Sequence, residues 1–173
     1  MNKIKVILIL IHLSLLTASF KYDSVKLGIS ESLGVFGLIS MDIELTTLSK
    51  ENEFFYFTIG SFPLPMFGGA GITYKRYYNS YGIDPLSKIY IQPYVSTTLF
   101  SSYILGPSDS PAKTFNMATI GFGADFFVIK INSTSINIQT GIFTQYNFSE
   151  RELFESPSDK PEIWPAINFK ISQ

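Results

Sequence analysis

The sequence predicts an all-β fold, an eight-stranded antiparallel up-and-down β-barrel, preceded by a signal peptide. Apolar and polar residues alternate along one segment after another, which is typical of strands with two different faces. Beyond the first twenty residues there is no second long apolar run, and helical periodicity is weak. Charged residues make up only 16% of the chain, whereas a typical soluble domain has about 25%.

The first residues have the order of a secretory signal peptide. "MNKIK" carries two lysines and no acid, the run from Val6 to Leu16 is apolar, and the small residues "TAS" follow. This run is too short to cross a bilayer as a helix, which takes about 20 residues; an uncleaved anchor helix is the alternative. We therefore divide the chain into a signal peptide, 1–19, cleaved after Ala18 or Ser19, and one barrel domain, 20–173.

Eight segments carry the alternation. In "GFGADFFVIK", for example, Phe122 and Phe126 share one face, and Gly121, Gly123 and Asp125 share the other. The predicted strands and their apolar faces are, in chain order, 24–32 with Val25, Leu27 and Ile29; 35–47 with Ile39, Met41 and Ile43; 53–62, aromatic on both faces; 69–79 with Ala70, Ile72 and Tyr74; 88–100 with Ile89, Ile91 and Val95; 115–130 with Ile120, Phe122 and Phe126; 135–148 with Ile136, Ile138 and Ile142; and 162–172 with Ile167, Phe169 and Ile171.

The residue types on the two faces indicate which face lies inside. A water-facing surface is rich in Lys and Glu, but here the polar face is mostly Gly, Ser, Thr, Asn and Gln. Small polar residues suit the narrow interior of an eight-stranded barrel, and a large aliphatic outer face suits lipid. The sequence thus predicts a transmembrane barrel with an interior network of ion pairs, formed by three acids and three bases: Lys26, Asp42, Glu44, Lys75, Asp125 and Lys170.

The links between the predicted strands differ in length. The short links "SKEN" and "NST" follow the second and sixth strands, and longer links follow the third, fifth and seventh. The first link, near Ser32, breaks this pattern, and the fourth, "SYGIDPLS", is long for a turn. Outer-membrane barrels have this asymmetry of short periplasmic turns and long external loops. Pro93 is unusual in a closed barrel, which has no edge strand, so we expect a bulge or a late strand start there.

The residues present exclude several kinds of chemistry. The only histidine, His12, lies in the signal peptide, and there is no cysteine, so serine–histidine, cysteine–histidine and ordinary zinc sites are excluded. Asp42 and Glu44 could act as acid and base, but a structural ion-pair network is the favoured interpretation. "GFGADF" lacks the third glycine of a dinucleotide loop and lies within a strand. We predict no enzyme activity and no catalytic, cofactor-binding or metal-binding residue.

The net charge excludes one class of partner. Without Lys3 and Lys5, 11 bases face 14 acids, a formal charge of −3. Nucleic-acid binding is therefore not expected, because it needs clustered basic residues.

The signal peptide, the eight alternating strands and the C-terminal strand "INFKISQ" together resemble the small bacterial outer-membrane β-barrel proteins of the eight-stranded type. The resemblance covers 20–173 and is one of architecture. It implies export to the bacterial outer membrane, contact with outer-membrane lipid, and recognition by the barrel-insertion machinery during biogenesis. It also implies a non-enzymatic role in envelope structure or in adhesion and binding through the loops, with an external partner that the sequence does not identify.

Three alternatives stay open at this point. The chain could be a secreted or periplasmic soluble barrel that binds an apolar ligand as lipocalins do. It could be a narrow, porin-like pore, although eight strands leave little free lumen. It could also be a lipid-modifying enzyme of the outer membrane.

Overall fold

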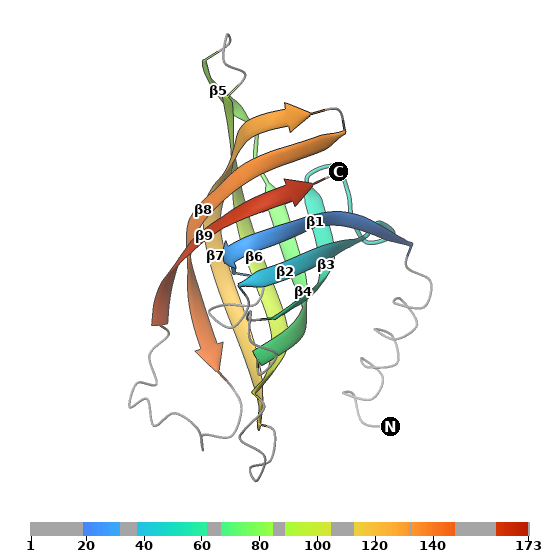
Figure 1. Ribbon diagram of the computed structural model, residues 1–173, viewed down its shortest axis with the longest axis vertical. Coiled ribbons are helices and arrows are strands. Elements are labelled where there is room, and N and C mark those ends of the chain that lie inside the picture. Colours follow the sequence, from blue (N-terminus) through green and yellow to red (C-terminus); the bar gives the residue numbers. More distant parts are fainter. Residues whose placement is uncertain are drawn as a thin grey trace.

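The computed structural model is a closed antiparallel β-barrel (Figure 1), which confirms the predicted eight-stranded architecture. It describes residues 19–31, 38–61, 67–84, 89–104, 113–131, 133–147 and 162–172. The strands are β1 (Phe20–Ile29), β2 (Ile39–Leu45), β3 (Glu53–Ser61), β4 (Phe67–Tyr77), β5 (Tyr81–Asp84), β6 (Ile89–Ile104), β7 (Lys113–Ile131), β8 (Thr134–Asn147) and β9 (Glu162–Ser172).

Eight of these strands form the ring. Their order is β1-β2-β3-β4-β6-β7-β8-β9, and β9 pairs with β1 to close it. The closing ladder runs from Ser24 opposite Ser172 to Ile29 opposite Ile167. Within it Lys26 lies directly opposite Lys170. Each strand of the ring therefore has a hydrogen-bonded neighbour on both sides.

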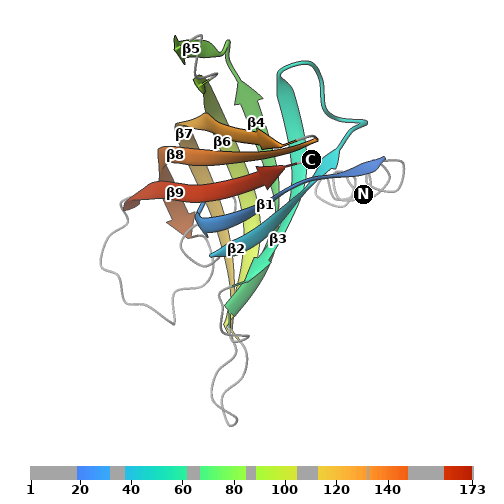
Figure 2. The ribbon, with the colours of Figure 1, turned by 45° about the horizontal axis from the view of Figure 1, so that its top comes forward.

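The ninth strand, β5, lies outside the ring and was not predicted. It pairs only with the start of β6, with Tyr81 opposite Ile91, and a register shift falls between Gly82 and Asp84. Four residues with a register shift are too few to show alternation in the sequence. Figure 2 shows β5 standing beyond the rim of the barrel.

Three strand boundaries differ by four residues from the prediction, which began the first strand at residue 24 and the second at residue 35, and ended the strand that corresponds to β6 at residue 100 instead of Ile104. β1 begins earlier, at Phe20, and β2 begins later, at Ile39. The ladder between them includes Lys21 opposite Glu44 and then shifts register between Tyr22 and Ser24. That shift breaks the alternation, so the pattern did not reveal the first residues of β1.

Pro93 lies within β6 without the predicted bulge or late strand start. It is opposite Ala124 of β7, and the ladder with β4 ends one residue later, at Tyr94 opposite Tyr77. The Pro93 carbonyl accepts a hydrogen bond from the Tyr78 N–H at 2.9 Å. Pro93 therefore lies one residue beyond the ladder between β4 and β6. Its nitrogen carries no hydrogen, and no residue of β4 requires a hydrogen bond from it there.

The two ends of the barrel carry different links. The β2–β3 and β7–β8 turns, the start of β1 and the end of β9 lie at one end, which we call the turn end, and so do the end of β4, the short β5 and the start of β6. At the opposite end, the loop end, β1, β3, β6 and β8 end and β2, β4, β7 and β9 begin. The walls also differ in length, because β6, β7 and β8 have 16, 19 and 14 residues, but β1, β2 and β3 have 10, 7 and 9.

Apart from Ser19, the predicted signal peptide lies outside the described residues. Within the described part of the chain, no helix has the length and apolar character needed to cross a membrane.

Candidate functional site: the polar lumen and the apolar outer wall

The two faces of each strand meet different surroundings. Along β7, Ile120 and Phe122 are 66% and 61% exposed, while Thr119 and Asp125 are 1% and 2% exposed. The same alternation runs round the ring. Polar side chains line much of the interior, together with apolar and aromatic ones such as Phe100, Met117 and Phe143, and apolar side chains cover most of the outside. This is the arrangement that the residue types on the two faces predict.

The first ion pair inside the barrel joins neighbouring strands. Lys26 Nζ of β1 lies 2.7 Å from Asp42 Oδ2 of β2, and both side chains are almost fully buried. The Thr58 hydroxyl of β3 donates a hydrogen bond to Asp42 Oδ1 at 2.7 Å. Both carboxylate oxygens of Asp42 therefore have a partner, as a buried charge requires.

A second cluster centres on Lys170 of β9. Its Nζ lies 3.3 Å from Asp23 Oδ2 and 3.9 Å from Asp125 Oδ2. Asp125 also accepts hydrogen bonds from Gln139 Nε2 at 2.6 Å and from the Tyr77 hydroxyl at 3.2 Å. These groups come from both ends of the sequence and meet only because the sheet closes on itself.

A further ion pair crosses the lumen. Glu31 follows β1, and its Oε1 lies 2.5 Å from Lys75 Nζ of β4. The Tyr94 hydroxyl of β6 donates to Glu31 Oε2 at 3.4 Å, and Thr119 of β7 donates to the Glu31 carbonyl at 2.6 Å. The Lys75 ammonium also lies 3.9 Å from the centre of the Tyr94 ring, a cation–π contact. Glu31 thus ties the end of β1 to three strands of the opposite wall.

The backbone at the end of β1 allows this inward turn. Gly28 has a φ of 128°, a backbone conformation that residues other than glycine rarely adopt. Just beyond it, Ser30 and Glu31 are both buried. The chain therefore leaves the wall at β1 and enters the barrel.

The predicted interior residues are not all equivalent. Lys26, Asp42, Lys75, Asp125 and Lys170 are buried in the lumen and ion-paired. Glu44 is only half-buried, and no ion pair joins it to another described residue. The acids that complete the clusters are instead Asp23 and Glu31, which the sequence interpretation missed. Asp23 falls at the register shift in β1 and Glu31 lies past its end, so alternation gave no signal for either.

The glycines of "GFGADF" make room for aromatic rings in the lumen. A Cβ atom on Gly123 would lie 2.7 Å from the Tyr94 hydroxyl oxygen, and one on Gly121 would lie 3.1 Å from Phe143 Cβ. Tyr94 and Phe143 are each only 2% exposed. The two glycines therefore serve packing inside the barrel.

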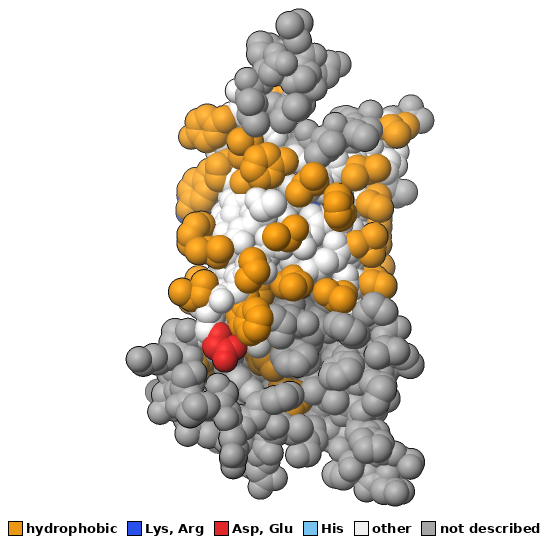
Figure 3. Space-filling model, turned by 60° about the vertical axis from the view of Figure 1, so that its left-hand side comes forward, with side chains coloured by type: hydrophobic (Ala, Val, Ile, Leu, Met, Phe, Trp, Pro, Cys, Tyr) orange, Lys and Arg blue, Asp and Glu red, His pale blue; other side chains and the backbone are white. Residues whose placement is uncertain are grey.

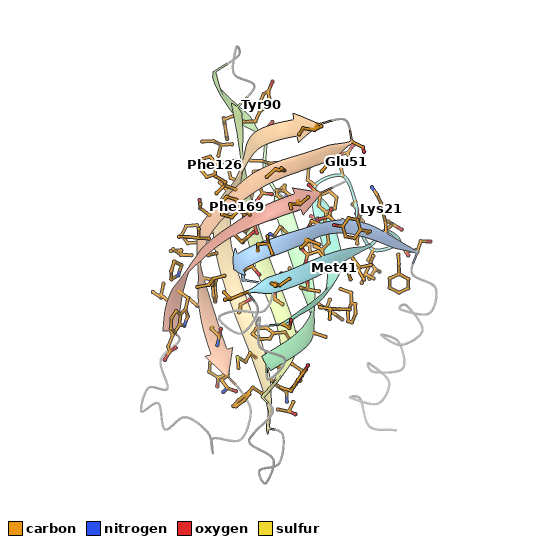
Figure 4. The ribbon with its side chains drawn as sticks, viewed as in Figure 1. Lys21, Met41, Glu51, Tyr90, Phe126 and Phe169 are labelled. Atoms are coloured by element: carbon orange, nitrogen blue, oxygen red, sulfur yellow. The ribbon has the colours of Figure 1, made fainter. Side chains whose placement is uncertain are left out.

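The outer wall is apolar between its ends. Figure 3 shows hydrophobic side chains over the middle of one face. Among the side chains that the structure describes, the exposed charged ones are Lys21, Lys50, Glu51, Arg76 and Glu162. All five lie in the β2–β3 turn or within two residues of a strand end. Figure 4 places Lys21 and Glu51 at the side of the barrel where β1 begins, away from Phe126 and Phe169.

In the part of the chain that the structure describes, no three acids, histidines or cysteines come together as a metal site. Lys26, Lys75, Gln139 and Asn168 are at most 1% exposed, whereas the side chain of Asp23 is 21% exposed. Comparison with protein-family models, with curated proteins and with solved structures finds no match to this chain.

Proposed function

We propose that this chain is a small integral protein of the bacterial outer membrane, without enzymatic activity, that acts through its loops in adhesion, binding or envelope structure. The observation that carries the proposal is the outer wall. It exposes large apolar side chains round the ring, including Leu99, Phe122 and Phe169 at 60%, 61% and 54%, and the exposed charged side chains among those that the structure describes lie near the ends of the strands. In water such a surface would be far larger than the apolar patches that monomers tolerate.

The height of this wall fits a bilayer. On β6, the residues that face outward run from Ile91 to the exposed Tyr103. Twelve residue steps of about 3.4 Å, on a strand tilted by about 40°, place these two residues roughly 31 Å apart along the barrel axis. Outer-membrane barrels have an apolar band about 25 Å tall with aromatic residues at both edges. The spacing therefore supports a wall tall enough to span the membrane, with the aromatic Tyr103 near one edge.

The interior argues against the soluble barrel. A lipocalin-like protein encloses a ligand cavity, and an apolar ligand needs an apolar lining. Here the lumen holds three lysines, four carboxylates and many hydroxyl and amide groups. Their near-complete burial also argues against an open pore, because water in a channel would reach them. It argues equally against a lipid-modifying active site within the barrel.

Fractionation tests the proposal directly. The full chain, expressed in a Gram-negative host, should sediment with the outer membrane and resist carbonate extraction. Phe122→Lys, at the middle of β7 on the outer face, should reduce the assembled fraction, whereas Lys21→Glu, exposed near the start of β1, should leave it unchanged. A monodisperse monomer in buffer without detergent would overturn the proposal in favour of the soluble barrel. Hydrolysis or acyl transfer on phospholipid vesicles would overturn its non-enzymatic part.

A further inference from the structure

An ion pair lies on the outer wall at β3 and β4. Arg76 of β4 and Glu53 of β3 are opposite each other in the ladder, with Arg76 Nη1 3.7 Å from Glu53 Oε1. Their side chains are 52% and 37% exposed, and the Arg76 guanidinium lies 5.8 Å from the centre of the Tyr78 ring. The same ladder row continues from Arg76 to Val95 of β6 and Phe122 of β7. Along this row the outer wall changes from charged at β3 and β4 to apolar at β6 and β7.

The apolar stretch on the outer face of β3 is short. It consists of Phe55, Phe57 and Ile59, between Glu53 on the turn side and Ser61 on the loop side. Eight residue steps of about 3.4 Å, on a strand tilted by about 40°, place Glu53 and Ser61 roughly 21 Å apart along the barrel axis. Because the apolar band of outer-membrane barrels is about 25 Å tall, the wall at β3 is lower than that band.

The apolar stretch of β7, three strands further round the ring, is longer. Its described outward residues are all apolar from Ala118 to Ile131, and Ile120 and Ile131 are 66% and 62% exposed. Thirteen residue steps, of which the register shift after Phe127 takes up about one, give roughly 31 Å along the axis. The apolar height of the outer wall is therefore about 10 Å greater at β7 than at β3.

We propose that the protein thins the bilayer beside β3 and β4, where Arg76 and Glu53 lie in the headgroup layer of the leaflet on the turn side. The inference rests on the proposed membrane location. The closed ring fixes the height of each wall, because every strand in it is hydrogen-bonded on both sides. A bilayer accommodates a short apolar stretch by becoming thinner next to it. Tilting the barrel would lower the projected height of β3 further, so it offers no remedy.

The dependence of folding on acyl-chain length tests this proposal. The protein is folded from urea into vesicles of didecanoyl, dilauroyl or dimyristoyl phosphatidylcholine, and the folding equilibrium constant is measured in each. The constant should fall as the chains lengthen. The double variant Glu53→Leu with Arg76→Leu extends the apolar wall, so it should raise the constant about tenfold in dimyristoyl vesicles and leave it nearly unchanged in didecanoyl vesicles.

Lys50→Leu with Glu51→Leu is the matched control. It replaces the same two kinds of charge in the β2–β3 turn, outside the strands, so its effect should not depend on chain length. If the leucine variant at β3 and β4 does not fold, Glu53→Gln with Arg76→Gln removes only the charges and should give part of the same rise.

The outcomes separate this proposal from the proposed function. The same chain-length dependence in the control and in the variants at β3 and β4, or none in any of them, would overturn the thinning alone. It would mean that Arg76 and Glu53 reach the headgroups through the flexibility of their own side chains. Failure of the unsubstituted protein to insert into any of the vesicles would overturn the proposed function as well.

Discussion

The inner and outer faces of β7 have opposite chemistry. Asp125 and Phe122 belong to one strand, yet Asp125 has its oxygens bonded to Gln139, Tyr77 and Lys170, while Phe122 is 61% exposed without any polar partner. Hydrogen bonds and ion pairs therefore stabilise the inner face, whereas the stability of the outer face depends on whether water or lipid surrounds it. The effect of a substitution on stability should therefore depend first on whether the residue faces the lumen or the outside, and only then on the chemistry of the new side chain.

The largest expected effect is at the inner face, at Glu31. Glu31→Ala leaves the buried Lys75 ammonium without its ion-pair partner, and removal of one member of a buried pair costs about 3–5 kcal/mol. Urea unfolding in detergent micelles measures the loss. Glu44→Ala is the control, because Glu44 is half-buried and should cost less than about 1 kcal/mol.

A double variant sharpens this test. Glu31→Leu with Lys75→Met replaces both charges by apolar groups of similar size, so it should be more stable than Lys75→Met alone. A loss in the double variant equal to the sum of the losses in Glu31→Leu and Lys75→Met alone would mean that Glu31 and Lys75 do not interact.

The second effect is at the outer face, at Phe122. Phe122→Arg places a cation at the middle of β7, where the cost in an outer-membrane barrel is about 2–4 kcal/mol near the midplane and roughly 0–1 near the interfaces. Phe20→Arg, at the first residue of β1, should fall in the lower range. The free energy of unfolding of each variant, measured in phospholipid vesicles, gives the comparison. Equal costs at the two positions would contradict a hydrocarbon layer round the wall.

The smallest effect is at the glycines. Gly123→Ala places a methyl group against the Thr140 carbonyl and the Tyr94 hydroxyl, and such overpacking costs about 1–3 kcal/mol. In Gly82→Ala the nearest atom is 3.7 Å away, on the Tyr90 ring, so stability should be nearly unchanged. Thermal unfolding in micelles separates the two. A neutral Gly123→Ala would show that the lumen is looser than its burial indicates.

The sequence predicted the ring and most of the lumen for one physical reason. A strand has a side-chain period of two, so a correct strand assignment also assigns Lys26, Asp42, Lys75, Asp125 and Lys170 to one face. The two lumen acids that the sequence interpretation missed lie where the alternation of inward and outward side chains is interrupted. Asp23 lies at a register shift, and Glu31 lies past the end of its strand.

The partner of each charge was not predictable from the sequence either. Which lysine meets which acid depends on the stagger between strands, and that stagger is a property of the closed barrel. Lys75, for example, meets an acid that follows β1, although the strands beside its own β4 are β3 and β6.

The opposition of Lys26 and Lys170 across the closing ladder has a consequence for assembly. These strands come from the two ends of the chain, and like charges directly opposite each other disfavour the pairing. The seam is therefore acceptable only when Asp42 and Asp23 are already in place to neutralise the two ammonium groups. A slip of β9 by one residue would turn Lys170 outward. In the observed register both ammonium groups keep their carboxylate partners inside the barrel, so these ion pairs favour the observed register of the closing ladder over a slipped one.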